Sequence, residues 1–207
     1  MFAFTCRTAV FTLFFFFVVS PATVFAQHHS GHSDAPGIKE TFVVDGFRVG
    51  DTPPPGSAVG RAGLRFDDGG YVHIVFGKPY RRGRVIFGGL VGMDQVWSAG
   101  AHRATEMFST VALTIGGEEL PAGGYSLFLT PGESHWTFHV NSVLGMHLAD
   151  EYDAEQDVMQ LKVKPHKLDA IVDDLTWAFD EAGSAILFSW GDTGVKIPMN
   201  RPAGEHN

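Results

Sequence analysis

The sequence predicts an all-β protein: an antiparallel, jelly-roll-like β-sandwich or a flattened barrel of about ten short strands, with little helix. Three observations lead to this prediction. Apolar side chains alternate with others along many short segments, as they do in strands with one buried face. Turn signals rich in glycine, proline and aspartate separate these segments at intervals of about 8–12 residues. The links are too short for helical crossovers, which favours antiparallel pairing.

The expected strands follow one another along most of the chain. The clearest pair is a hairpin of residues 61–66 and 72–76, joined by the turn Asp67-Asp68-Gly69-Gly70. Short helical segments are expected only near residues 85–90 and 148–156. The other expected strands are residues 41–44, 111–115, 125–130, 136–140, 159–163, 175–179, 186–190 and 195–197.

The N-terminal segment has the pattern of a signal peptide. Arg7 precedes an apolar stretch at residues 8–19, and Val24-Phe25-Ala26 forms a small-x-small cleavage site. The apolar stretch is shorter than the roughly 20 residues that a membrane-spanning helix needs. We therefore expect residues 1–26 to be removed on export to the periplasm or the extracellular space, with no stable membrane insertion afterwards.

The rest of the chain is predicted to hold one folded domain. Residues 27–57 are expected to be a flexible leader, rich first in histidine and then in proline, which favours extended geometry. Residues 58–200 have one uniform alternating texture and form a single predicted β domain, followed by a tail at residues 201–207.

Composition excludes some classes of function. The net charge of −8 disfavours nucleic acid as a partner. The single cysteine, Cys6, lies in the predicted signal peptide, so the mature chain has neither a disulfide nor thiol chemistry. No recognised motif for a catalytic nucleophile, a phosphate loop or a dinucleotide site occurs, and we expect no catalytic residue and no cofactor.

Three blocks between residues 72 and 199 resemble a bacterial family of exported proteins, domain-of-unknown-function family 2911. The resemblance implies a β-rich fold and no established activity. The family usually has Arg and Asn at the positions of Ser98 and His102, so a family site that used them is altered here. The blocks are Gly77-Lys78-Pro79-Tyr80-Arg81-Arg82-Gly83-Arg84-Val85-Ile86-Phe87-Gly88-Gly89-Leu90-Val91, Val96-Trp97-Ser98-Ala99-Gly100-Ala101-His102-Arg103-Ala104-Thr105 and Leu120-Pro121-Ala122-Gly123-Gly124-Tyr125-Ser126-Leu127-Phe128.

The second of these blocks contains the best candidates for ligand binding. It mixes aromatic, small, basic and acidic groups, and such a mixture can cover a polar ligand and orient it by hydrogen bonds. A purely structural role is the alternative, with the tryptophan in the core and the threonine as a cap or cross-strand pair. The candidate residues are Trp97, His102, Arg103, Thr105 and Glu106.

A basic cluster contributes further candidates, Tyr80, Arg81 and Arg84. Arginines separated by Gly83 can present guanidinium and backbone N–H groups to a carboxylate or phosphate. The alternative is internal pairing with acidic neighbours, which a chain this acidic offers in number.

We expect no metal site. His135 and His139 share one face of a strand, but residues four apart on a strand lie about 13 Å apart, too far to share one ion. Two weaker possibilities are metal capture by the histidines of the leader and Ca²⁺ binding by the acidic stretch at residues 150–157.

These patterns favour a non-catalytic module of the cell envelope that binds a small polar ligand or an envelope protein through its loops. Two alternatives stay open. One is a structural or assembly protein, in which the motifs serve only folding. The other is a hydrolase or isomerase in which His102 and Glu106 exchange protons with the substrate.

Overall fold

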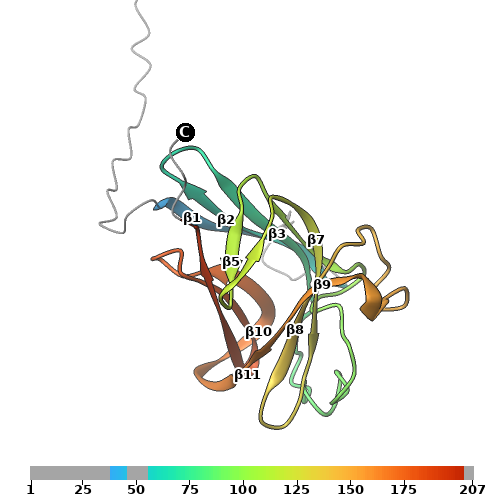
Figure 1. Ribbon diagram of the computed structural model, residues 1–207. Helices are drawn as coiled ribbons and strands as arrows, with labels where there is room; N and C mark the ends of the chain where they lie inside the picture. The colour runs from blue at the N-terminus through green and yellow to red at the C-terminus, as the bar shows by residue number, and fades with distance from the viewer. Residues whose placement is uncertain (1–37, 46–55, 203–207) are drawn as a thin grey trace, which may run out of the picture. The chain divides into compact units, whose positions relative to one another are not determined.

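The computed structural model describes residues 38–45 and 56–202 of the 207-residue chain, all within one unit that spans residues 32–207. These described residues form eleven strands and one turn of 3-10 helix (Figure 1). In chain order they are β1 (Ile38–Asp45), β2 (Ala58–Phe66), β3 (Tyr71–Lys78), β4 (Thr105–Ser109), β5 (Leu113–Ile115), β6 (Glu118–Leu120), β7 (Gly123–Thr130), β8 (Trp136–Asn141), η1 (Ala154–Gln156), β9 (Asp157–Val163), β10 (Pro165–Phe179) and β11 (Ala185–Asn200).

The strands form two antiparallel sheets that do not close into a barrel, which confirms the predicted sandwich. The larger sheet has the order β1-β2-β3-β4-β7-β8-β9, and the smaller has the order β10-β11-β5-β6. Two strands, β10 and β11, are longer than predicted and pair with each other as one hairpin. The pairing shifts in register after Lys167 and after Val172, where the hairpin bends.

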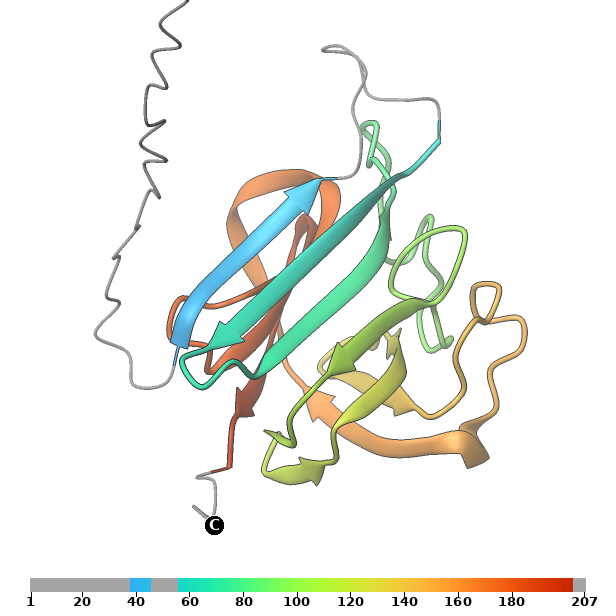
Figure 2. The ribbon, with the colours of Figure 1, turned by 90° about the horizontal axis from the view of Figure 1, so that it is seen from above.

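The core lies between the sheets, where β10 packs against β1, β2 and β3 (Figure 2). The larger sheet contributes side chains such as Leu64, Ile74 and Phe138, and the smaller contributes Trp177 and Phe188. Each is at most 1% exposed. Burying one such side chain stabilises the fold by roughly 1.5–3 kcal/mol, which is why the alternating pattern determines the faces of the strands.

Ion pairs join segments that are distant in sequence. The buried Nζ of Lys78 at the end of β3 lies 2.9 Å from Oδ2 of Asp174 on β10, and so ties the two sheets together. At the tip of the β2–β3 hairpin, Arg201 and the N–H of Gly70 lower the pKa of Asp68 from 3.8 to about 2.

Asp180 closes the β10–β11 turn. Burial acts to raise its pKa, but hydrogen bonds from the side chain and backbone of Ser184, from the Ala185 N–H and from Lys196 outweigh burial. The net result is a pKa below the usual value of 3.8.

The structure differs from the sequence prediction in several elements. The strand predicted at residues 41–44, inside the segment assigned to the leader, is part of the longer β1, which pairs with β2. Strands β4 and β6 were not predicted. Residues 85–90 form turns rather than helix, and only residues 154–156 of the second expected helix are helical.

Other expectations fall outside the described residues: the signal peptide, the leader apart from residues 38–45 and 56–57, and the end of the tail. Within the described residues, the search for a helix of sufficient length and apolarity to cross a membrane found none.

Candidate functional site

Most of the candidate residues lie in the long connection between β3 and β4, residues 79–104. Connections longer than about 12–15 residues without regular structure are uncommon and are often functional. This connection is tied down at both ends. Tyr80 pairs with Asp174 of β10, and Trp97 pairs with Leu129 of β7. The connection is therefore held by both sheets.

The backbone of Trp97 continues the line of β4 along β7. Its N–H donates to the carbonyl of Leu129 and its carbonyl accepts from the Leu129 N–H, both at 2.9 Å. Its half-buried ring stacks on Trp190, with centroids 5.7 Å apart, and meets Phe87 and Phe188 edge to face. Trp97 is thus held rigidly by the aromatic end of the core while part of it stays accessible.

Residues 98–104 loop out of this strand line, and the loop begins with a constrained turn. Buried Ala99 has φ of 51°, in the left-handed region that costs a non-glycine residue about 1–3 kcal/mol. Its carbonyl accepts two buried hydrogen bonds at 3.0 Å, from Oγ1 of Thr105 and from Nε1 of Trp177. These bonds hold the strained conformation.

The loop also lies very close to β3. A Cβ at Gly77 would be 2.2 Å from the carbonyl oxygen of Ala101, and a Cβ at Gly100 would be 2.8 Å from Oγ1 of Thr105. Glycine at both positions lets the two backbones approach each other closely.

A cavity of about 460 Å³, here called the Trp97 cavity, opens beside this loop. Its volume is typical of small-molecule sites. Its walls come from the long connection and from the β8–β9 loop, and the exposed ring of His102 stands on one of them. The lining residues are Ser57, Pro79, Arg84, Leu90, Val91, Val96, Trp97, Ser98, Gly100, Ala101, His102, Leu148, Ala149, Asp150 and Trp190.

Two features of the cavity walls are energetically unfavourable. The residue Ser98 is fully buried, and its Oγ has no hydrogen-bond partner among the described residues. An unpaired buried hydroxyl costs roughly 1–3 kcal/mol. His102 and Leu148 have φ of 69° and 54°, so left-handed non-glycine residues occur on two sides of the cavity. Such strain clusters at functional sites.

In the described part of the chain, the side chains of Arg81 and Arg84 bind backbone carbonyls rather than acidic side chains. Arg81 Nε donates to the carbonyl of Arg84 at 3.1 Å, and Arg84 Nε and Nη2 donate to the carbonyls of Arg81 and Tyr80 at 3.0 and 2.7 Å. Within the described part of the chain no carboxylate forms an ion pair with either arginine. The turn therefore orients both guanidinium groups and leaves donors free.

Arg84 also lines a second cavity of about 230 Å³, here called the Arg81 cavity. Arg81, Ile171 and Asp192 contribute to its walls. Arg84 thus lies between the two cavities. Three of the eight residues predicted from the sequence, Trp97, His102 and Arg84, line the Trp97 cavity. A fourth, Arg81, lines the neighbouring Arg81 cavity.

The other four candidates have structural contacts and do not line the Trp97 cavity. Arg103 Nη1 donates to the Gly145 carbonyl at 3.4 Å, and Glu106 Oε1 accepts from the Gly145 N–H at 2.7 Å, so both brace the β8–β9 loop. Thr105 supports Ala99, as described above. Tyr80 is buried, and its hydroxyl has no partner in the described segments.

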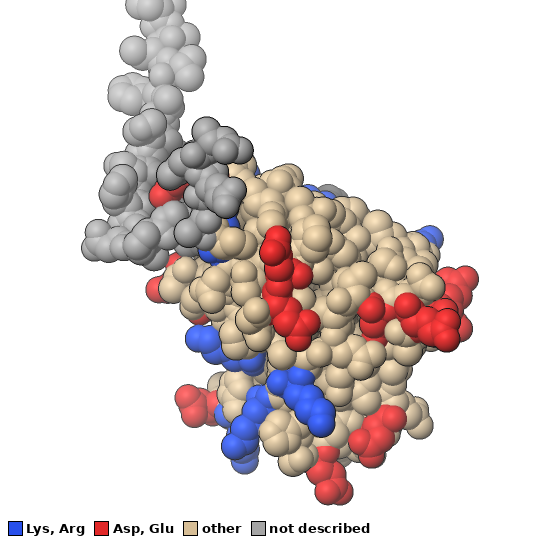
Figure 3. Space-filling model, viewed as in Figure 1, with Lys and Arg blue, Asp and Glu red and all other residues tan. Residues whose placement is uncertain are grey.

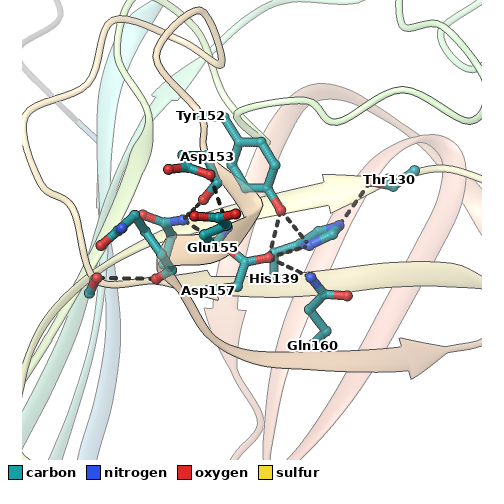
Figure 4. A network of polar contacts seen from close by, with 10 residues as sticks. Thr130, His139, Tyr152, Asp153, Glu155, Asp157 and Gln160 are labelled. Carbon is teal, nitrogen blue, oxygen red and sulfur yellow. Dashed lines mark hydrogen bonds and ion pairs between the residues drawn. The ribbon is translucent and has the colours of Figure 1, made fainter.

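A buried polar network, which sequence analysis did not find, fastens the β8–β9 loop to the sheet (Figure 4). His139 Nε2 lies 2.9 Å from Oγ1 of Thr130, and His139 Nδ1 lies 2.9 Å from Oδ2 of Asp157. The Tyr152 hydroxyl donates to the same Oδ2 at 2.5 Å. Burial and the Asp157 carboxylate raise the pKa of this tyrosine above 10, which keeps it a donor.

The connectivity of Thr130, His139 and Asp157 matches that of a hydrolase triad, but the setting does not. None of the cavities described here is lined by these three residues. Asp157 is further occupied by the amides of Asn141 and Gln160 at 2.8 and 2.9 Å. We assign the network to positioning the loop whose residues 148–150 form one wall of the Trp97 cavity.

Neither the predicted His102–Glu106 pair nor a cluster of metal ligands is present among the described residues. No hydrogen bond joins His102 to Glu106 in the described part of the structure, and Glu106 Oε1 accepts instead from the Gly145 N–H. No three His, Cys, Asp or Glu side chains among the described residues are arranged to hold a metal ion. His135 is exposed whereas His139 is buried in the polar network, so the two have different environments.

Several cavity residues escaped the sequence analysis. Leu148 and Asp150 lie far from the central block in sequence. Leu148 has a left-handed backbone conformation and Asp150 is exposed, so neither belongs to an alternating pattern of apolar and polar residues. The available hint was the mixed apolar and acidic composition of residues 144–157. On the face in Figure 3, basic side chains gather below the centre of the view, and acidic side chains lie at several places around them.

A family model described as "Protein of unknown function (DUF2911)" matches residues 63–199. The chain belongs to this family. The match covers the larger part of the sequence and includes both the long connection and the β8–β9 loop. All residues that line the Trp97 cavity except Ser57 therefore lie within the DUF2911 region. Searches of curated proteins and of solved structures found no significant match.

Proposed function

We propose that this DUF2911 protein is a non-catalytic binding module of the cell envelope, and that its ligand is a small molecule or terminal group that enters the Trp97 cavity. The observation that carries the proposal is the cavity of about 460 Å³, whose walls hold the strained residues His102 and Leu148 and the buried Ser98, whose Oγ has no partner in the described segments. Strained backbone and unpaired buried polar groups of this kind cluster at functional sites.

Two further observations support binding over a purely structural role. Arg84 is oriented by backbone carbonyls and has no acidic partner in the described segments, so its remaining donors are available. The cavity walls are held rigidly by the Trp97–Leu129 pairing and by the His139 network, which preorganises them. Location in the envelope rests on the signal pattern of residues 1–26.

A ligand screen by thermal unfolding tests this proposal. A true ligand at 100 times its Kd stabilises the fold by about 2.7 kcal/mol, which raises Tm by about 5–10 °C for a domain of this size. Ala101→Trp fills the cavity and should abolish the shift. Ala182→Trp, on the exposed β10–β11 turn, is the matched control and should keep it.

The Ser98→Ala variant distinguishes a binding role of Ser98 from a purely structural role. If Ser98 serves only folding, the variant binds every screening hit as well as the wild type does. A binding role predicts a several-fold weaker affinity together with unchanged or higher stability of the free protein, because an unpaired hydroxyl has been removed. Equal binding of the hits by Ala101→Trp and the wild type would remove the Trp97 cavity as the site.

A further inference from the structure

We propose that the ligand of the Trp97 cavity is an amphiphilic organic anion: an apolar body that ends in a carboxylate. The C-terminal residue of a peptide and an aromatic carboxylic acid share this chemistry. The inference rests on the proposed function and adds the chemical class of the ligand. It follows from the distribution of apolar surface and of charge around the two cavities.

The walls of the Trp97 cavity are mainly apolar. Leu90, Val91, Val96 and Leu148 contribute aliphatic surface, and Trp97 contributes an accessible part of its ring. Leu90 is 46% exposed and so adds accessible apolar surface to this wall. A purely polar ligand would leave this surface without complementary contacts, whereas an apolar body covers it.

The anion-binding group is Arg84, at the boundary between the two cavities. Two of its nitrogens already donate to backbone carbonyls of its own turn, so the guanidinium plane is set before a ligand arrives. Its Nη1 has no hydrogen-bond partner among the described residues and is free to donate. A preoriented guanidinium without a carboxylate partner is suited to a carboxylate from outside the chain.

Acidic side chains define where the anion can lie. Asp150 stands on the wall of the Trp97 cavity, where its Oδ2 lies 2.8 Å from Nδ1 of His147, and Asp192 stands on the wall of the Arg81 cavity. Each disfavours a carboxylate placed directly beside it. The anionic end is therefore directed to the boundary formed by Arg84, and the apolar end to the surface beside Trp97.

Matched pairs of probes test this assignment. The first pair is N-acetyl-Leu-Phe with a free carboxylate and its C-terminal amide, and the second is indole-3-acetate and indole-3-acetamide. Binding is measured by NMR titration of the amides of residues 96–102 and 148–150 in the mature protein. We expect the carboxylate of at least one pair to bind about tenfold more tightly than its amide, as a charge-assisted hydrogen bond is stronger than a neutral one.

Two variants locate the charge. Arg84→Gln should make the carboxylate and the amide bind equally. Arg82→Gln removes the same charge from the same turn at an exposed position that lines neither cavity, and should keep the tenfold preference. If the first pair alone shows the preference, the ligand is a peptide terminus. If the second pair alone shows it, the ligand is a small aromatic acid.

Three results would overturn the inference. The first is equal binding of carboxylate and amide by the wild type, which removes the anion but leaves the cavity as a binding site. The second is an equal loss of preference in Arg82→Gln and Arg84→Gln, which reveals a diffuse field instead of a directed contact. The third is no perturbation by any of the four probes at millimolar concentration. In that case a hit of other chemistry from the thermal screen would leave the proposed function standing.

Discussion

Gly77→Ala should destabilise the protein and distort the wall of the Trp97 cavity. Gly77 is not in the left-handed region, so alanine is compatible with its backbone and the effect is steric. The new Cβ would lie 2.2 Å from the carbonyl oxygen and 2.8 Å from the nitrogen of Ala101. Ordinary contacts begin near 3.4 Å, so the backbone of the loop has to move by about 1 Å.

The magnitude follows from two opposing terms. Overpacking against rigid neighbours typically costs about 1–3 kcal/mol. The atoms that the new Cβ meets are backbone atoms of Ala101, which cannot rotate away, so the cost here is at the upper end of this range. Alanine restricts the unfolded chain and returns about 0.4–1 kcal/mol. The net loss is about 2 kcal/mol, which lowers Tm by about 4–8 °C.

Thermal and urea unfolding of the mature protein measure this loss. The matched control is Gly123→Ala on β7, where the nearest atoms to a new Cβ belong to the Tyr125 side chain at 3.3 Å and beyond and can give way. The control should change stability by less than about 1 kcal/mol. If Gly77→Ala were as stable as the control, the close packing of the loop on β3 would not exist and the cavity wall would need to be rebuilt.

Three further predictions follow from other parts of the fold. Asp68 and Asp180 have pKa values below 3.8, so the stability that their carboxylates contribute is present above about pH 4 and is lost as pH falls toward 2. Asp68→Asn and Asp180→Asn should therefore lower Tm at pH 7. The difference in Tm between each variant and the wild type should shrink at pH 2.5. Tyr152→Phe should lower the free energy of unfolding in urea by about 1–3 kcal/mol and speed hydrogen exchange in the β8–β9 loop. Tyr80→Phe should leave stability unchanged or raise it, because the Tyr80 hydroxyl has no partner among the described residues. A similar loss of stability in both variants would show that the network does not fasten the loop. The protein recovered from the envelope fraction should have the intact mass of a chain that begins at Gln27, and retention of residues 1–26 would refute the signal assignment.

Most of the sheet was predictable because period-two alternation is a local signal. Ala62, Leu64 and Phe66 alternate with exposed or backbone-only positions, and they face the core as expected. The pattern failed for β10, whose N-terminal half is exposed on both faces and carries register shifts. An exposed, bulged strand has no buried face to impose alternation, so its sequence resembles that of a loop.

The candidate site was only partly predictable, for a different reason. Trp97, His102 and Arg84 were identified because aromatic and basic groups on a loop are chemically distinctive. Their convergence with Leu148 and Asp150 depends on how two loops fold toward each other, which no local pattern records. The partners of Arg81 and Arg84 likewise depend on geometry: an acidic composition favours ion pairs, but the turn directs both side chains to backbone carbonyls.

The amino-acid sequence by itself determined the all-β class, the faces of most strands and the membership of the DUF2911 region, because each depends on residues close together in the chain. Tertiary structure alone decided which polar groups are left without partners. The Oγ of Ser98 has no partner among the described residues, and Asp157 is fully occupied, only because of what the rest of the fold brings to each. Hydrogen bonds are short and directional, so they depend on distances between strands and loops that are set only once the two sheets have packed.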